Sequence, residues 1–317
     1  MIKSVNQLVT ERCNSQCKMC SIWKIKDRAY EMNPEEFDKL YSNPEFKEVE
    51  DLCISGGEAT LRTDLFEVID SMIKNMPKLN MLFLSTNGSN PNVAKNFAKK
   101  YSPKIKDVYI CLSLEGDKEV HKKIRGVDTY NKVLETAELI KDLNIKNCHV
   151  IFSTTIVPEN CNQKSLNHVK KIAKKLNCTF SFRPASQNDT FYHNRKSDNF
   201  IIDDSQIKFL ENYMISEKMS DPFLDILFES IKGKETIMGS KKCGIKCLAG
   251  DISIFTKSNG DIFPCINSSR LIGDKERGIF EKRYKVGSKE LCPCCTECQI
   301  YPMLNFSKYS DKNGKQN

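Results

Sequence analysis

The sequence predicts an α/β fold in which helices cover a parallel sheet. Strand-like and helix-like segments alternate between residues 5 and 183, and repeated strand–helix units are typical of parallel sheets. The predicted strands around residues 52–54 and 82–84 are short and apolar, which indicates a sheet that is buried on both faces. A chain of 317 residues has room for one large domain and a smaller one.

Six strands and five helices are predicted in this alternating part. The strands are expected at residues 5–10, 51–55, 81–86, 107–114, 149–155 and 179–183. The helices are expected at residues 34–41, 64–75, 93–101, 130–143 and 166–176. In parallel βα barrels the functional groups gather at the carboxyl ends of the strands, so the residues that follow each strand are the candidates for a site.

The rest of the chain divides by composition. Residues 184–202 are polar and rich in Asn, Asp and Ser, and we expect them to form a loop over the site, within a first domain at 1–202. Residues 203–242 are expected to be connecting helices. Seven cysteines fall between residues 243 and 298, which predicts a second, cysteine-dense domain at 243–308. The polar end at 309–317 is expected to be disordered.

Composition and charge exclude several classes of protein. No apolar run approaches the roughly 18 residues that a membrane span needs, and the first residues lack a signal peptide, so we expect a cytoplasmic protein without a membrane partner. Fifteen cysteines then favour metal or cluster binding over disulfides. The net charge of +8 is spread over lysine-rich faces such as residues 170–175, which we interpret as solvated surface and not as a nucleic-acid site.

Three cysteines follow the first predicted strand with the spacing C-x3-C-x2-C. They are Cys13, Cys17 and Cys20. A structural zinc site has four ligands, and an iron–sulfur cube held by four cysteines is also closed. Three clustered thiolates would leave one iron without a protein ligand, and an open metal position is where chemistry occurs. The alternatives are a zinc knuckle with its fourth ligand elsewhere, or three unrelated buried thiols.

Polar motifs also end the next three strands. The second strand leads into Gly56-Gly57-Glu58, where glycines permit a close approach of backbone to a ligand and Glu58 adds a carboxylate. The third ends in Thr86-Asn87-Gly88. The fourth ends in the sequence SLEG at 113–116, followed by His121 and Arg125. A planar guanidinium suits carboxylate binding, whereas His121 is expected to be a helix cap or a packing residue.

These motifs, in this order, resemble the radical S-adenosylmethionine (radical SAM) enzymes over residues 5–183. The resemblance implies a partial (βα)6, TIM-like barrel. It implies that Cys13, Cys17 and Cys20 are the catalytic ligands of a 4Fe–4S cluster whose open iron chelates SAM. The further residues that it assigns to SAM are Met19, Gly56, Gly57, Glu58, Thr86, Asn87, Ser113 and Arg125. Among these, Glu58 would bind the ammonium, Ser113 and Arg125 the carboxylate. Met19 departs from the family, which usually has an aromatic residue there.

The resemblance also implies a reaction. An electron from an external donor such as flavodoxin or ferredoxin breaks SAM into methionine and a 5′-deoxyadenosyl radical, which takes a hydrogen atom from the substrate. The cofactor supplies this chemistry, and the protein must orient the substrate and exclude water.

The cysteine-dense part contains a predicted hairpin with its turn at Asn259-Gly260. This hairpin would bring Cys247 and Cys265 together, and the segment resembles the opening of a SPASM or twitch domain. The later cysteines are spaced too closely for a full SPASM domain, so the resemblance implies one auxiliary 4Fe–4S cluster. Its ligands would be Cys247, Cys265, Cys295 and Cys298, with Cys292 and Cys295 as a competing pair for the last two, and Cys243 and Cys294 spare. Four thiolates would suit zinc equally.

We therefore expect a radical SAM oxidoreductase that oxidises or crosslinks a peptide during natural-product maturation. Ile266 stands where some SPASM epimerases have a second cysteine, which favours oxidation. The alternative is dehydrogenation or epimerisation of a sugar or aminocyclitol. Because the first predicted strand begins at residue 5, we expect no leader-binding domain before it, which weakens the peptide interpretation. A remote alternative is a non-catalytic zinc-binding scaffold on the same fold.

Overall fold

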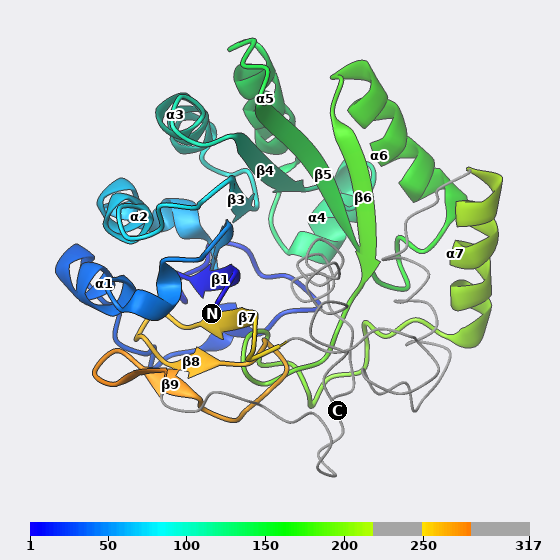
Figure 1. Ribbon diagram of the computed structural model, residues 1–317. Coiled ribbons are helices and arrows are strands. Elements are labelled where there is room, and N and C mark those ends of the chain that lie inside the picture. Colours follow the sequence, from blue (N-terminus) through cyan, green and yellow to red (C-terminus); the bar gives the residue numbers. More distant parts are fainter. Residues whose placement is uncertain (218–248, 280–317) are drawn as a thin grey trace, which may run out of the picture.

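The computed structural model describes residues 1–217 and 249–279. Its described part is built on one sheet with the strand order β10-β9-β8-β7-β1-β2-β3-β4-β5-β6 (Figure 1). The strands are β1 (Ser4–Leu8), β2 (Asp51–Ser55), β3 (Met81–Thr86), β4 (Asp107–Ser113), β5 (Cys148–Ile156), β6 (Thr179–Pro184), β7 (Ser253–Thr256), β8 (Ile262–Phe263), β9 (Gly273–Asp274) and β10 (Gly278–Ile279). Neighbouring strands from β7 to β6 run parallel, whereas β8, β9 and β10 continue the sheet in antiparallel pairs.

Most of the helices lie on the outer face of the curved sheet, whereas α4 (Lys118–Arg125) lies inside the curve, next to the loop that carries Cys13, Cys17 and Cys20 (Figure 1). The helices are α1 (Pro34–Tyr41), α2 (Leu65–Ile73), α3 (Pro91–Tyr101), α4 (Lys118–Arg125), α5 (Tyr130–Lys141), α6 (Gln163–Lys175) and α7 (Asp204–Ser216), with 3-10 turns η1 (Ile22–Lys24), η2 (Pro44–Phe46) and η3 (Ala59–Leu61). None of the helices in the described ranges is long and apolar enough to cross a bilayer.

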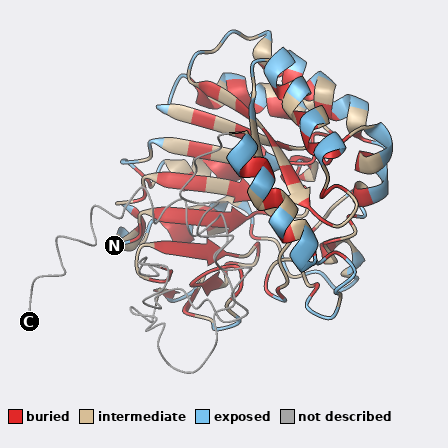
Figure 2. Ribbon diagram, turned by 90° about the vertical axis from the view of Figure 1, so that its right-hand side faces the viewer, coloured by how far each residue is buried: buried red, intermediate tan, exposed pale blue. Residues whose placement is uncertain are grey.

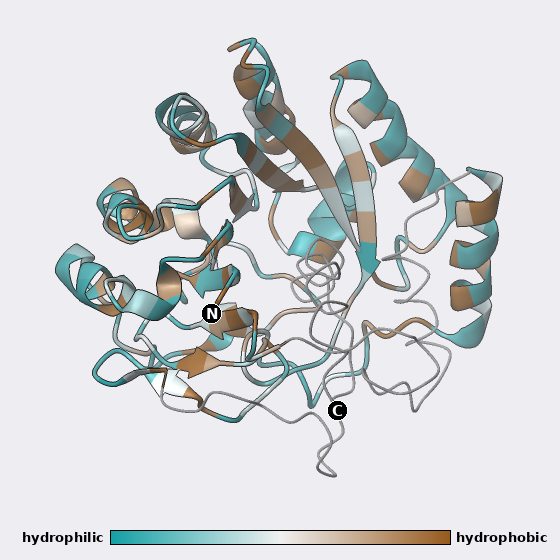
Figure 3. Cartoon of the chain, viewed as in Figure 1, coloured by the Kyte–Doolittle hydropathy of each residue, from teal (hydrophilic) through white to brown (hydrophobic). Residues whose placement is uncertain are grey.

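The hydrophobic core lies between the sheet and these helices. Alternate strand residues such as Leu82, Ile110 and Phe152 point into it and are completely buried. Figure 2 shows the buried strands at the centre with the outer faces of the helices exposed, and Figure 3 shows the matching change from hydrophobic strands to hydrophilic helix faces. Because most of the helices cover the other face, the concave face of the sheet is the one that a ligand of the barrel could contact.

The concave face carries in-register rows of side chains that alternate with the core residues. Phe83, Tyr109 and His149 stack across β3, β4 and β5 with ring centroids 4.5 Å and 4.8 Å apart. Nearer the carboxyl edge, three half-buried serines on adjacent strands face one another in register: Ser113 of β4, Ser153 of β5 and Ser181 of β6. The concave face is therefore aromatic toward the amino edge and rich in hydroxyl groups toward the carboxyl edge.

The predicted strands and helices of residues 5–183 are confirmed, with small shifts at their ends. The first strand stops at Leu8 because the chain then leaves the sheet, after Val9 N donates to Ser55 O (2.9 Å). Helix α4 was not predicted. Its only buried residues are His121 and Ile124, too few for a visible helical period, and the helix is instead delimited by an Asp117 cap and a left-handed Gly126 (φ 70°).

The predicted hairpin at Asn259-Gly260 is confirmed. Strands β7 and β8 pair antiparallel, Gly260 N donates to Lys257 O (3.0 Å), and Gly260 has φ +88°, which suits glycine. Unexpectedly, β7 also pairs in parallel with β1, with Ser4 opposite Ser253, so this segment extends the barrel sheet. The domain boundaries at 202, 242 and 308 stay predictions, because they depend largely on residues outside the described ranges.

Asp51, at the amino end of β2, makes the fold sensitive to pH. Burial raises its pKa from 3.8 to about 7; the Ser4 hydroxyl, which donates to Oδ1 (2.5 Å), opposes that rise and Glu50 adds to it. The folded protein therefore holds a proton that the unfolded chain loses near pH 4. This favours the fold at low pH, and the benefit disappears as the pH rises through about 7.

We accordingly expect Asp51→Asn, which can still accept from Ser4, to raise the apparent melting temperature more at pH 8 than at pH 5, because the cost of the buried carboxyl grows from about pH 4 up to about pH 7. Each unit of pKa shift corresponds to about 1.4 kcal/mol. Thermal unfolding of the anaerobic protein at both pH values checks this, with the exposed Asp27→Asn as control. An equal effect of Asp51→Asn at the two pH values would contradict the prediction.

Candidate active site

The three cysteines of the triplet lie on one loop at the carboxyl edge of the sheet, between β1 and η1. Burial raises the pKa of Cys13 to about 11 and that of Cys20 to about 12, and the neighbouring Cys17 raises both further. The three thiols are therefore close enough to influence one another. Left without a metal, Cys13 and Cys20 would stay protonated at neutral pH, so metal binding there would release protons.

The donor set has the chemistry of an iron–sulfur cluster site, because it consists of three cysteine thiols on one loop. Within residues 1–217 and 249–279, no group of three His, Cys, Asp or Glu side chains is arranged to hold a metal ion. A multi-iron cluster instead takes each thiolate on a different iron, which requires thiols that surround a larger space. The surroundings of the thiols are also partly apolar, since Cys17 and Cys20 pack with Met19, Ile124 and neighbouring hydrophobic side chains.

The two glycines after β2 allow this loop to approach the sheet. Gly57 N donates to Thr10 O (2.7 Å) and Glu58 N to Arg12 O (2.7 Å), which continues the pairing of β1 and β2 into the cysteine loop. A Cβ at Gly56 would lie 2.7 Å from Thr10 O, and one at Gly57 would lie 2.3 Å from Arg12 O. The lack of a side chain at these two glycines therefore allows the backbone of residues 10–12 to lie close to the end of β2.

Glu58 is buried and fixed by its neighbours. Its Oε1 accepts from Thr60 N (3.1 Å), Thr60 Oγ1 (2.6 Å) and Thr86 Oγ1 (2.6 Å), and its Oε2 accepts from Asn87 N (2.6 Å). The carboxylate is only 1% exposed. It therefore joins the ends of β2 and β3, and its predicted contact with the SAM ammonium would have to share oxygens that already accept four hydrogen bonds.

Asn87 and α4 hold the cysteine loop from two sides. Asn87 Nδ2 donates to Asn14 Oδ1 (2.7 Å) and Ser15 Oγ (2.8 Å). From the other side, Gln16 N and Lys18 N donate to the carbonyl oxygens of the last two α4 residues, both at 2.9 Å. The thiols of this loop are thus positioned by strands and a helix far from it in sequence.

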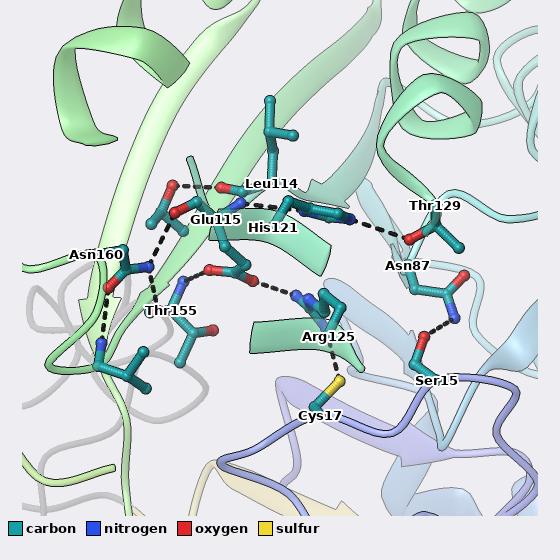
Figure 4. Close-up of polar contacts among 12 residues, drawn as sticks. Ser15, Cys17, Asn87, Leu114, Glu115, His121, Arg125, Thr129, Thr155 and Asn160 are labelled. Atoms are coloured by element: carbon teal, nitrogen blue, oxygen red, sulfur yellow. Dashed lines mark hydrogen bonds and ion pairs between the residues drawn. The ribbon is translucent and has the colours of Figure 1, made fainter. Parts of the chain in front are cut away.

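Arg125 connects α4 to the triplet (Figure 4). Its Nη2 donates to Glu115 Oε1 (2.5 Å) and its Nη1 to Cys17 Sγ (3.4 Å). Burial lowers its pKa, but Glu115 and Cys17 outweigh that effect and raise it above the ordinary value, so the guanidinium stays charged. Ser113, its predicted partner at the SAM carboxylate, lies half-buried at the end of β4.

Glu115 is a site residue to which the sequence analysis assigned no role. It is completely buried, and its Oε2 accepts from Thr155 N (2.8 Å). The signal was its place in the SLEG motif, two residues after Ser113, the last residue of β4.

His121 has the packing role that was expected. Its Nδ1 accepts from Glu115 N (3.3 Å), so its Nε2 carries the proton and donates to Thr129 Oγ1 (3.0 Å). Burial lowers its pKa to about 3, which keeps the imidazole neutral. The bond from Glu115 N supports the Glu115 backbone, and neither of these two His121 hydrogen bonds involves a thiol of the triplet.

Comparison with known proteins identifies the family. The sequence model of the radical SAM superfamily matches residues 8–169, which is more than half of the 317 residues. The chain belongs to the radical SAM superfamily. The family is enzymatic and implies SAM and a 4Fe–4S cluster as cofactors, so the predicted membership of the radical SAM enzymes is confirmed, whereas the SPASM or twitch module stays a prediction.

Curated relatives of this radical SAM protein are described as probable GTP 3′,8-cyclases. The protein from Thermococcus kodakarensis is 32% identical over 133 residues, which cover 41% of each chain. The one from Methanococcus aeolicus is 28% identical over 204 residues, covering 61% of this chain and 63% of its own. The radical SAM chain thus spans less than two thirds of the length of these relatives.

Solved radical SAM structures share the fold. Streptococcus suis SuiB bound to its precursor peptide SuiA superposes with a TM-score of 0.59 at 14% identity, covering 84% of this chain and 60% of SuiB. The anSMEcpe structure with bound AdoMet gives a TM-score of 0.62 at 20% identity, covering 87% and 78%. These similarities confirm the partial TIM-like barrel of the radical SAM fold.

The polar loop after β6 packs on the radical SAM cysteine loop, as expected for a segment over the site. Asn194 Nδ2 donates to Met19 O (2.7 Å), and Ser21 N donates to Tyr192 O (2.8 Å). Met19, predicted to bind SAM, is 6% exposed and packs with Val157 and Phe200. These contacts fix the backbone on both sides of Cys20.

The segment that contains Cys265 reaches the same region of the radical SAM barrel. Phe263 and Ile266 belong to a hydrophobic cluster that also contacts Cys13 and Cys20, and Cys265 itself is buried. The other cysteines predicted or considered as auxiliary ligands lie outside the described residues; they are Cys243, Cys247, Cys292, Cys294, Cys295 and Cys298.

Proposed function

We propose that this radical SAM enzyme holds a 4Fe–4S cluster on Cys13, Cys17 and Cys20, and uses it to abstract a hydrogen atom from its substrate. The observation that carries the proposal is the convergence of three mutually interacting thiols on one loop. When bound, the cluster supplies the electron that cleaves SAM into methionine and the 5′-deoxyadenosyl radical, which takes the hydrogen atom. An external one-electron donor such as flavodoxin or ferredoxin would deliver that electron.

The chain's own residues would bind SAM and exclude water. In this proposal Ser113 and Arg125 would bind the SAM carboxylate, and Glu58 the ammonium. The further SAM-facing candidates are Met19, Gly56, Gly57, Thr86 and Asn87. Several of these also support the cysteine loop, so cofactor binding and loop position would be coupled. The loop at 184–202, which packs on residues 19 and 21, would limit water access to the radical.

For the substrate, we propose oxidation or crosslinking of a peptide. The support is the fold shared with SuiB, which has been solved bound to a precursor peptide, and with anSMEcpe, solved with bound peptides. Ile266, in place of the second cysteine of some epimerases, favours a net oxidation.

A small hydroxylated molecule, such as a sugar or aminocyclitol, is the second candidate. The in-register Ser113, Ser153 and Ser181 place three hydroxyl groups on adjacent strands, roughly 4.8 Å apart. Such a row suits a substrate with several hydroxyl groups. The curated relatives, named for a nucleotide substrate, are consistent with a small molecule as well.

One experiment tests the reaction and separates the substrates. Anaerobically reconstituted protein with dithionite and SAM should form 5′-deoxyadenosine. Peptides encoded beside the gene and a panel of sugars and nucleotides would then be supplied in deuterated form. Deuterium transfer to 5′-deoxyadenosine identifies the substrate class. No 5′-deoxyadenosine from iron-loaded protein would contradict the proposed function.

We further propose one auxiliary 4Fe–4S cluster on Cys247, Cys265, Cys295 and Cys298. Full loading would give about eight irons per chain, four in each cluster. Changing Cys265 and Cys298 to Ala should leave about four irons and SAM cleavage without product. The control is Cys53→Ala with Cys111→Ala, two sheet cysteines outside the ligand set. Zinc in place of the second cluster, or eight irons in the double variant, would overturn the assignment.

A further inference from the structure

The Arg125 guanidinium lies between a buried carboxylate and a cysteine sulfur. Arg125 Nη2 donates to Glu115 Oε1 at 2.5 Å, and Nη1 lies 3.4 Å from Cys17 Sγ, within reach of an N–H···S hydrogen bond (Figure 4). The Glu115 side chain is 0% exposed and the Arg125 side chain 12%. One end of the guanidinium is thus neutralised, and the other donates to a thiol of the triplet.

Both ends of this arrangement are anchored. Glu115 is fixed by Thr155 N at its carboxylate and by Asn160 Nδ2 at its carbonyl oxygen (3.1 Å). The Arg125 carbonyl oxygen accepts from Gln16 N, which lies next to Cys17 in the chain. Glu115 holds the Arg125 guanidinium and Gln16 holds the Arg125 backbone. The side chain therefore cannot turn away from Cys17 without breaking one of these contacts.

We infer that Arg125, positioned by Glu115, sets the reduction potential of the cluster that Cys17 would help to hold, through an N–H···S hydrogen bond to Cys17. This inference rests on the proposed function, because it requires the cluster on the triplet. Reduction adds negative charge to a cluster, and a hydrogen bond to a cysteine sulfur stabilises that charge, which raises the potential. Glu115 cancels much of the arginine's net charge, so the directed hydrogen bond is the main contribution.

This role is separable from SAM binding. A residue that acts only on the SAM carboxylate has no effect on the cluster when SAM is absent. A hydrogen bond to Cys17 Sγ acts on the cluster whether or not SAM is present. The potential of the SAM-free cluster therefore distinguishes the two roles, and it is measured without turnover.

The test is an EPR-monitored redox titration of the reconstituted full chain without SAM. The double variant Glu115→Gln/Arg125→Met removes the ion pair with no change in net charge, so it leaves no buried charge unpaired. We expect its cluster potential to fall, with a roughly tenfold higher ratio of oxidised to reduced cluster at a fixed potential, which is about 59 mV for a one-electron couple. Arg125→Lys should shift it in the same direction, because an ammonium cannot hold both partners as the planar fork does.

Arg277→Lys is the matched control, since Arg277 also pairs with a carboxylate, Asp274 Oδ2 (2.6 Å), but lies in the turn between β9 and β10. The signal of the triplet cluster is identified by its loss in a variant that lacks the three cysteines. If the double variant does not fold, Arg125→Lys carries the test. An unchanged potential in the folded Arg125 variants would overturn this inference alone, whereas the absence of a triplet-dependent cluster in the wild type would overturn the proposed function.

Discussion

The triple variant Cys13→Ala/Cys17→Ala/Cys20→Ala is expected to form no 5′-deoxyadenosine, while iron bound elsewhere in the chain is retained. The three thiols are the donors that converge at the carboxyl edge of the sheet, where they interact with one another and with Arg125. Without them no iron is left with an open position for SAM. The measurement is 5′-deoxyadenosine by liquid chromatography together with iron analysis of the same sample.

A matched triple variant separates this effect from the general loss of cysteines. Cys53, Cys111 and Cys178 lie outside the loop, and their change to Ala removes the same number of thiols. We expect that control to keep its SAM cleavage, apart from any loss of stability. SAM cleavage that persists in the Cys13/Cys17/Cys20 variant would falsify the ligand assignment.

Gly57→Ala should be nearly as damaging, although it adds a single methyl group. The new Cβ would lie 2.3 Å from Arg12 O and 2.8 Å from Glu11 O. Both atoms are backbone, so the cysteine loop must move. Overpacking of this kind costs roughly 1–3 kcal/mol, and here the displaced segment carries the thiols. We expect at least a tenfold loss of SAM cleavage and lower iron occupancy.

A graded series of glycine variants makes this prediction specific. Gly56→Ala places its Cβ 2.7 Å from Thr10 O, so its effect on SAM cleavage should be smaller. Gly273→Ala meets Gly278 O at 2.6 Å, but in β9, away from the loop, and should lower stability without lowering SAM cleavage in the protein that remains folded. Equal effects of the three substitutions on SAM cleavage would contradict a specific role for Gly57.

The elements that the sequence predicts well are those whose signal is local. The apolar strands β2 and β3 and helix α1 have the predicted bounds, because short apolar runs and the Asn33-Pro34 helix start are visible within a few residues. Helix α4 was missed because only two of its residues are buried. The pairing of β7 with β1 could not be predicted either, because a four-residue strand carries no information about its distant partner.

The same limit applies to the candidate site. Spacing and motif order predict the triplet and the polar residues at the strand ends, since these are properties of short segments. The contact between Arg125 and Cys17 joins residues 108 positions apart and depends on the end of an unpredicted helix. The role of Gly56 and Gly57 in seating the loop against β1 also required the structure, since a glycine pair in sequence does not say which backbone it approaches.

The pairing of β7 with β1 has a consequence for the order of folding. Gln7 Nε2 on β1 donates to Thr256 O (3.3 Å) and Lys257 O (3.1 Å), across about 250 residues of chain. At about 5–20 residues per second, synthesis needs on the order of 10–40 s to pass from β2 to β7. During that interval one edge of β1 remains unpaired on the ribosome. The cysteine loop, which contacts Phe263 and Ile266 beyond β7, acquires its full surroundings only among the late events of synthesis.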